Sequence, residues 1–164
     1  MKQTALSMMA ILLVMLLSAS QVLAEVQLPA VFCDNMVLQQ QTEAAIWGKA
    51  NKNSTVKVFT SWNNKSYSTK ASSDGNWKLK VATPKAGGPY EITISDGKAL
   101  KLKNVLIGEV WICSGQSNME MPMKGFRNQP ITGSSDAVAL STNSNIRLFT
   151  VKRATSLEPL DNFT

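Results

Sequence analysis

The sequence contains no histidine, and this absence excludes several classes of enzyme. The 164 residues include two cysteines and no histidine. A Ser-His-Asp or Cys-His hydrolase site cannot be completed within this chain, because an imidazole is the general base of such sites. Two cysteines without histidine also do not make up a zinc site, which takes about four protein ligands of these types. We therefore expect neither a bound metal nor another cofactor.

Strong charge of either sign is also missing. The chain has 17 basic and 11 acidic residues, a net charge of +6, and 44% hydrophobic residues, which excludes disorder as the overall state. The basic excess lies in residues 25–104, where lysines alternate with apolar residues as on a solvated strand face. A sugar-binding or polyanion-binding face is the alternative. The modest charge and the lack of a recognition motif argue against a nucleic-acid partner.

The one long unbroken hydrophobic run of the sequence lies near the amino terminus. Residues 8–17 are all apolar, Lys2 precedes them, and Val22-Leu23-Ala24 follows. This run is too short to span a bilayer, which takes about 20 residues. The pattern predicts a signal peptide over residues 1–24, cleaved near Ala24, rather than an uncleaved anchor. We therefore expect a secreted or periplasmic protein without a stable membrane anchor.

An oxidising compartment would allow Cys33 and Cys113 to pair. A disulfide requires their Cα atoms to come within about 7 Å, which the sequence alone leaves open. The alternative is that both are small buried residues, because free cysteine packs as a hydrophobic side chain.

Residues 25–104 have the pattern of short antiparallel strands. Trp77, Leu79 and Val81 alternate with lysines, and this period of two marks a half-buried strand. Asp-Gly pairs at 74–75 and 96–97 favour hairpin turns. The predicted strands are 26–32, 36–39, 44–47, 56–62, 66–71, 77–82, 90–95 and 100–103. Their spacing predicts an antiparallel β-sandwich. Its tryptophans either pack in the core or form a sugar-binding platform; they are Trp47, Trp62 and Trp77.

The hydrophobic pattern of the sequence changes at residue 105. Residues 105–113 are almost continuously apolar, which predicts a strand buried on both faces of a parallel sheet. Residues 134–141 are weakly helical, and 146–151 predict another strand. Residues 105–164 therefore indicate the start of an α/β domain. We expect this domain to be incomplete, because one crossover and two strands cannot bury such a sheet.

A serine follows the apolar run in the sequence Gly115-Gln116-Ser117-Asn118-Met119. A serine on a tight turn after a buried strand is a recurrent nucleophile, and Gly115 permits such a turn. The backbone N–H of Ser117 could stabilise the developing oxyanion. The last glycine of the G-x-S-x-G motif is missing, and a polar loop is the alternative interpretation of so short a motif.

Longer segments carry a family resemblance. Residues 108–122 (GEVWICSGQSNMEMP) closely resemble the nucleophile block of the sialate O-acetylesterase family, within the SGNH/GDSL hydrolase superfamily. Residues 28–32 (LPAVF), 34–40 (DNMVLQQ) and 146–151 (IRLFTV) also resemble that family. The resemblance implies a β-sandwich followed by an SGNH-type three-layer α/β domain, of which residues 105–164 are the truncated start.

The resemblance also implies a chemistry. Ser117 would attack the acetyl group of O-acetylated sialic acid or another acetylated glycan, form an acetyl-enzyme, and supply one oxyanion N–H. Gly115, Gln116 and Asn118 would shape the turn. The family's Asp-x-x-His base is not in this chain, so we expect an amino-terminal fragment that is inactive without the carboxyl-terminal part. The alternatives are an acetylxylan-type esterase and a non-catalytic glycan-binding β-sandwich module.

Overall fold

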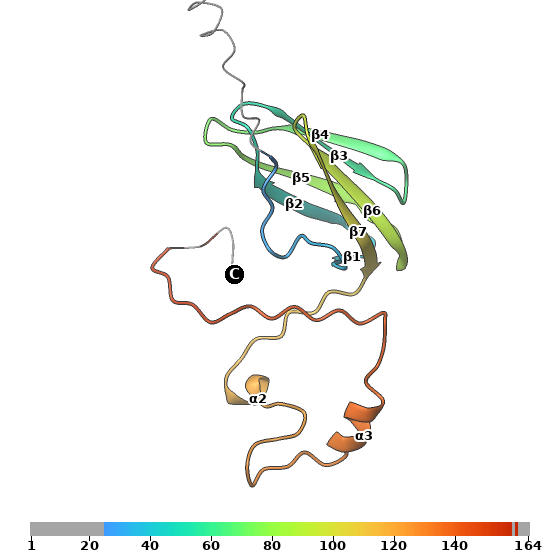
Figure 1. Ribbon diagram of the computed structural model, residues 1–164, viewed down its shortest axis with the longest axis vertical. Helices are drawn as coiled ribbons and strands as arrows, with labels where there is room; N and C mark the ends of the chain where they lie inside the picture. Colours follow the sequence, from blue (N-terminus) through green and yellow to red (C-terminus); the bar gives the residue numbers. More distant parts are fainter. Residues whose placement is uncertain (1–24, 159, 161–164) are drawn as a thin grey trace, which may run out of the picture.

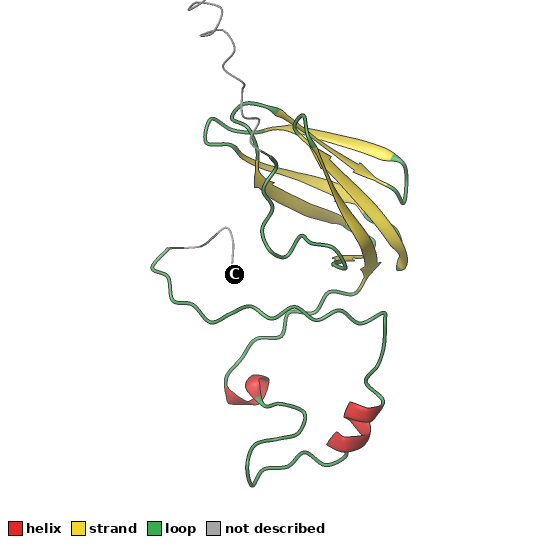
Figure 2. Ribbon diagram, in the orientation of Figure 1, coloured by secondary structure: helices red, strands yellow, loops and turns green. Residues whose placement is uncertain are grey.

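The computed structural model describes residues 25–158 and Leu160, so the predicted signal peptide lies outside the described residues. Within the described part, strands precede two short helices (Figures 1 and 2). The strands are β1 (Val37–Gln39), β2 (Glu43–Lys49), β3 (Thr55–Thr60), β4 (Lys65–Lys70), β5 (Asn76–Ala82), β6 (Gly87–Ser95) and β7 (Ala99–Gly108). The helices are α2 (Ser117–Glu120) and α3 (Ser134–Ala139).

The strands form two sheets. Five strands pair in the order β1-β7-β6-β3-β4, and β2 pairs with β5. Neighbouring strands are antiparallel except β1 and β7, which are parallel with Gln39 opposite Gly108. The sequence predicted antiparallel pairing throughout, and this pair departs from it because the last strand returns beside the first in the same direction. The pairing places the end of β1 beside the point where the chain leaves β7.

One hydrophobic core joins the two sheets. In β3, Val56, Val58 and Thr60 are fully buried, whereas Lys57 and Phe59 are exposed, which confirms the predicted period of two. Core residues come from β2 and β5 of the small sheet as well as from β3, β6 and β7. Fully burying an aliphatic side chain of this size contributes about 1.5–3 kcal/mol. This shared core is the main stabilising feature of residues 25–108.

The two Asp-Gly turns have different outcomes. The turn at Gly97 joins β6 to β7 as a hairpin, as predicted. Gly75, with φ +83°, also lies in a tight turn, closed by the bond from its N–H to the Ser72 carbonyl. However, β4 and β5 belong to different sheets, so the hairpin predicted there is wrong. The turn residues determine the local bend, whereas packing determines which strand the chain pairs with next.

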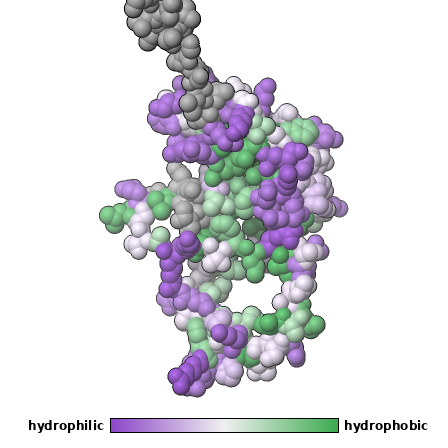
Figure 3. Space-filling model, viewed as in Figure 1, coloured by the Kyte–Doolittle hydropathy of each residue, from purple (hydrophilic) through white to green (hydrophobic). Residues whose placement is uncertain are grey.

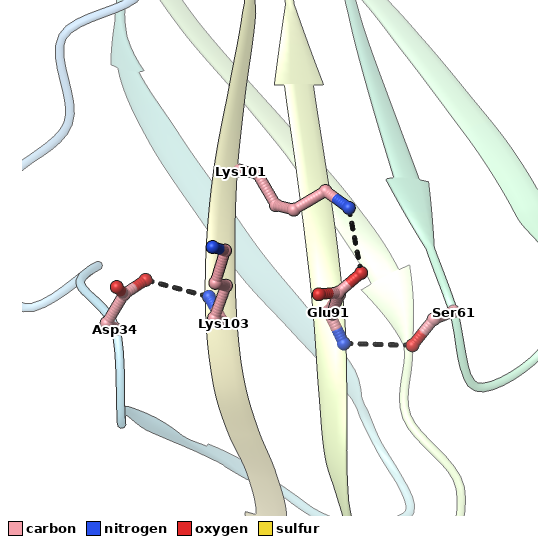
Figure 4. A network of polar contacts seen from close by, with 5 residues as sticks. All are labelled: Asp34, Ser61, Glu91, Lys101 and Lys103. Atoms are coloured by element: carbon pink, nitrogen blue, oxygen red, sulfur yellow. Dashed lines mark hydrogen bonds and ion pairs between the residues drawn. The ribbon is translucent and has the colours of Figure 1, made fainter.

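Polar contacts fasten the strands near the corner at Asp34 (Figure 4). The Lys103 N–H donates to Asp34 Oδ1 at 2.7 Å, and the Glu91 N–H donates to Ser61 Oγ at 2.9 Å. Lys101 Nζ and Glu91 Oε2 form an exposed ion pair at 2.9 Å. An exposed pair of this kind contributes about 1 kcal/mol or less. The hydrogen bonds from the Lys103 and Glu91 N–H groups contribute more to the structure, because each satisfies a main-chain donor.

The strand predicted over residues 26–32 is wrong. This segment makes an isolated bridge from Gln27 to Lys49 and is otherwise irregular, with a turn at residues 30–31. Pro29 has no N–H to donate to a ladder. Val26 and Phe32 are nevertheless buried, 4% and 7% exposed. The apolar residues of the segment therefore contribute to the core without forming a strand.

The fully buried strand predicted over residues 105–113 is also wrong. Its first residues are the end of β7, which crosses the predicted domain boundary at 104/105 and ends at Gly108. Beyond this point the chain leaves the sheets, and Trp111 and Ile112 are 82% and 92% exposed. The pairing of β7 with β1 and β6 does not extend past Gly108. An apolar run indicates burial but does not supply a pairing partner.

The part of the chain after Gly108 lies below the sheets (Figure 1). Helix α3 confirms the weak helix predicted at 134–141, but residues 146–151 form no strand and Leu148 is 92% exposed. Figure 3 shows hydrophobic residues on the surface of this lower part. No strand follows Gly108 within residues 109–158, so an SGNH-type α/β layer remains a prediction.

Cys33 and Cys113 are both free and exposed. They neither pair nor pack as small buried residues, so both interpretations of the cysteines are wrong.

Candidate nucleophile turn

Ser117 begins α2, the first helix after the sheets. Gln116 precedes it with φ −97° and ψ −145°, and the Met119 N–H donates to the Gln116 carbonyl at 2.9 Å. This bond closes a tight turn around Ser117. The Ser117 side chain is exposed rather than packed inward, and a nucleophilic hydroxyl requires such access.

Gly115 permits this turn because of a close side-chain approach. A Cβ atom built on Gly115 would lie 2.6 Å from Met119 Cγ, which is closer than real Cβ contacts. Gln116 and Asn118 flank the serine and are exposed, as Gly115 is. The structure thus places the four predicted site residues together in one exposed turn, and their catalytic role stays a prediction.

No general base is assembled at this turn. Within residues 25–158, no hydrogen bond joins the Ser117 hydroxyl to a carboxylate or another basic group. The nearest carboxylate along the chain, Glu120, forms an ion pair with Arg153. An unassisted serine hydroxyl is a poor nucleophile near neutral pH. The described residues therefore hold a nucleophile candidate without its proton acceptor.

A hydrogen-bonded junction lies where the chain leaves β7 toward Ser117. Gln40 Nε2 donates to Glu109 Oε1 at 2.6 Å, and Gln39 Nε2 donates to Glu109 Oε2 at 3.1 Å. Gln39 Oε1 in turn accepts from the Val110 N–H at 2.8 Å, and Gln40 Oε1 accepts from the Ala86 N–H at 2.8 Å. These bonds hold the exposed carboxylate, and those from Gln40 and then Gln39 lower the pKa of Glu109. The junction fixes the direction in which the chain leaves the sheet.

This junction was not predicted from the sequence, although the sequence contains a signal for it. Gln39 and Gln40 lie in residues 34–40, and Glu109 lies in 108–122, two of the segments that carry the family resemblance. Only the parallel pairing of β1 with β7 shows that these segments meet.

The described residues contain neither a metal-binding cluster nor a membrane-spanning helix. No group of three or more Cys, Asp or Glu side chains within them could hold a metal ion. None of the helices in that part of the chain is long and apolar enough to cross a membrane.

The sequence of this chain is similar to the sequences of several sialate O-acetylesterases. The chain is 32% identical over 146 residues to the sialate O-acetylesterase of Mus musculus, which covers 82% of this chain and 26% of that protein. It is 36% identical over 99 residues to the sialate O-acetylesterase of Homo sapiens, covering 54% of this chain and 19% of that one. No family model matches the chain.

A solved structure is similar in fold as well as sequence. A carbohydrate acetylesterase from Xanthomonas citri superposes with a TM-score of 0.75 and 31% sequence identity. The match covers 85% of this chain and 31% of that protein. The chain thus spans about a quarter of the length of the rodent relatives that it matches, and under a third of the solved one.

Proposed function

Because this chain is a member of the sialate O-acetylesterase-like family, we propose that it carries the nucleophile of a carbohydrate esterase that removes O-acetyl groups from sialic acid or a related sugar. Ser117 Oγ attacks the acetyl carbonyl, and the bond between the carbonyl carbon and the sugar oxygen breaks. The sugar leaves as an alcohol, because its oxygen takes up the proton that a base has removed from Ser117. Water then hydrolyses the acetyl-enzyme and releases acetate. The proton of Ser117 passes to a base that lies outside the described residues.

The observation that carries this proposal is the exposed hydroxyl of Ser117 at the start of α2. The N–H groups of a first helical turn have no acceptor within the helix, so the Ser117 N–H can donate to an oxyanion. Gly115 allows the close approach of Met119, and Gln116 supplies the carbonyl that closes the turn. Asn118 follows the nucleophile and shapes the same turn.

We further propose that the esterase is completed by a carboxyl-terminal part that supplies the base. The two sheets would then form a β-sandwich ahead of an SGNH-type α/β domain. Exposed apolar side chains after Gly108 support this, because such residues normally mark a surface that another segment covers. They include Trp111, Ile112, Leu140 and Leu148, each more than four-fifths exposed. The chain alone is then inactive, and the signal peptide directs it to a secreted or periplasmic location.

A second substrate is acetylated plant polysaccharide such as acetylxylan. The solved relative bears the broader name carbohydrate acetylesterase rather than sialate O-acetylesterase. Nothing in the Ser117 turn distinguishes these sugars, so both substrates belong in the test.

The experiment has two arms. In the first, the full chain is assayed for acetate release from an aryl acetate, O-acetylated sialic acid and acetylxylan, and no Ser117-dependent turnover is expected. In the second, residues 25–164 replace the matching segment of the Xanthomonas citri enzyme. We expect this chimera to hydrolyse at least one of the three esters.

Matched variants decide the role of the serine. In the chimera, Ser117→Ala should lower kcat by about a thousand-fold or more, whereas Ser114→Ala should retain most of the activity. Circular dichroism checks that each variant folds. A folded Ser117→Ala chimera with undiminished turnover would overturn the proposal, and Ser117-dependent turnover by the chain alone would overturn its inactivity.

A further inference from the structure

A groove of about 850 Å³ lies on the two-sheet part of the molecule, and no residue of the Ser117 turn lines it. Its walls come from the end of β2, the start of β5, the end of β4 and the amino-terminal residues 27–29, with Leu160 from the tail. A sugar-binding face in this region is one of the alternatives that the sequence leaves open. Of the three tryptophans of the predicted platform, Trp47 and Trp77 border this groove.

A fixed indole ring stands in this groove. Trp47 is partly exposed, and its ring meets Phe32 edge to face, with centroids 4.6 Å apart and planes at 82°. Lys78 is its cross-strand partner on β5, so the two side chains share one face of the small sheet. The contact with Phe32 and the packing against the core support the Trp47 ring, and Lys78 lies on the same face of the sheet.

The charge of the groove is of one sign. Lys49, Lys70 and Lys78 line it, all three are exposed, and none belongs to an ion pair of the described residues. No Asp or Glu is among the lining residues. Lys98 and Lys101 are paired with Glu25 and Glu91, whereas exposed lysines elsewhere, such as Lys57 and Lys80, are also outside the ion pairs of the described residues. What distinguishes Lys49, Lys70 and Lys78 is that they line one groove. Unpaired cations gathered in one hollow attract an anion.

Hydrogen-bonding groups accompany the lysines. Asn76 and Ser72 are exposed in the lining, and Asn76 lies opposite Lys49 in the strand register. Trp77 also borders the groove, but it is a core residue at 4% exposure and its Nε1–H is buried, so it is not counted among these groups. The other tryptophan of the predicted platform, Trp62, is not in the groove and instead donates to the Ala82 carbonyl at 2.9 Å.

We propose that this groove binds a carboxylated carbohydrate, with a sugar ring against Trp47 and its carboxylate among Lys49, Lys70 and Lys78. Sugar rings present apolar C–H faces that suit an aromatic ring, and their hydroxyls suit Asn76 and Ser72. An uncharged glycan would leave the three lysines unused. A second copy of the chain is a poorer occupant, because each copy carries a net charge of +6. The inference goes beyond the esterase activity and does not depend on Ser117.

The test is a titration of the full chain with tetragalacturonate and with its fully methyl-esterified form, which removes the charge alone. We expect saturable binding of the acid by isothermal calorimetry, weakened by salt, and at least about ten-fold weaker binding of the ester. Lys78→Glu should reduce the affinity for the acid by about ten-fold or more. Lys57→Glu, on an exposed position of β3 outside the groove, is the matched control and should bind as the unmodified chain does.

Trp47→Ala tests whether the sugar ring stacks on Trp47, and it should also weaken binding of the acid. Trp47→Ala also removes the contact with Phe32 and could therefore impair folding. In that case the comparison of Lys78→Glu with Lys57→Glu still decides the test. Equal binding of acid and ester would overturn the proposal, as would equal losses in the two lysine variants or no binding. Self-association abolished by Trp47→Ala would assign the groove to a second copy of the chain and also overturn it. Because Ser117→Ala should leave this binding unchanged, failure here is distinguishable from failure of the proposed esterase.

Discussion

The side-chain amide of Gln40 donates a 2.6 Å hydrogen bond to the carboxylate of Glu109, across the point where the polypeptide leaves the sheets. The two residues are far apart in sequence and meet because β1 and β7 pair in parallel. Gln39 completes the contact from the neighbouring position and also accepts from the Val110 N–H. The first residues after β7 are therefore held to the sheet, and the segment that leads to Ser117 starts from a defined position.

The junction should depend on pH in a definite direction. The hydrogen bonds lower the folded-state pKa of Glu109 below that of an unfolded glutamate, which is about 4.3. Their stabilisation is then fully present above the unfolded pKa and is lost as the pH falls through the lower, folded pKa. Amide exchange of Val110, corrected for its intrinsic pH dependence, should show protection at neutral pH that disappears in acid.

The matched variants are Glu109→Gln and Glu91→Gln. The first places an amide donor against the Gln39 and Gln40 donors, so Val110 should exchange faster at neutral pH. The second removes an exposed carboxylate that pairs with Lys101 and should leave Val110 unchanged. Unaltered exchange in Glu109→Gln would contradict the junction.

The Ser117 turn should not tolerate a side chain at position 115. Gly115→Ala would place a Cβ 2.6 Å from Met119 Cγ, so either the Met119 side chain or the turn must shift. In the active chimera we expect kcat/KM to fall by about ten-fold or more, since small misplacements of a nucleophile are costly. Met119→Ala removes the clashing atom, and the double variant should regain most of the loss. A double variant as impaired as Gly115→Ala would show that this contact is not the reason for the glycine.

Stability should reside in the residues between the sheets. Ile94 is fully buried, so Ile94→Ala should cost about 2–5 kcal/mol in the free energy of unfolding. Val110 lies just beyond β7 and is 48% exposed, so Val110→Ala should change the free energy of unfolding by about 0.5 kcal/mol or less. Chemical denaturation measures both, and similar losses would contradict the placement of the core.

Both thiols should react without unfolding the protein. Cys33 and Cys113 are free and exposed, so an aromatic disulfide reagent should titrate both under native conditions. Cys33→Ser and Cys113→Ser should each remove one reactive thiol. A native protein that shows no reactive thiol until it is reduced would indicate the disulfide that the structure lacks.

Alternation of side chains predicted most strands well. In β3 and β5 the buried positions are mostly apolar and the exposed positions mostly polar, in the alternation that the sequence shows. Each face of such a strand has a distinct environment, so local sequence carries the information. The same reasoning failed at residues 26–32, where Pro29 cannot donate to a ladder, although Val26 and Phe32 are buried.

Local sequence patterns did not predict which distant segments pair with one another. The apolar run at 105–113 is divided at Gly108, because β1 and β6 accompany β7 only that far. The placement of Gly115, Gln116, Ser117 and Asn118 in one turn follows from their adjacency. The contact of Glu109 with Gln39 and Gln40 requires knowledge of which strands meet, and no periodicity in either segment contains it.

The most direct measurement is the site of acetylation in the chimera after a rapid acid quench with an aryl acetate. Mass spectrometry of the digested protein should find one acetyl group on Ser117, absent from Ser117→Ala and present in Ser114→Ala. Turnover accompanied by an acetyl group on a different residue, or an equal amount of acetyl-enzyme in the Ser117→Ala chimera, would contradict the account.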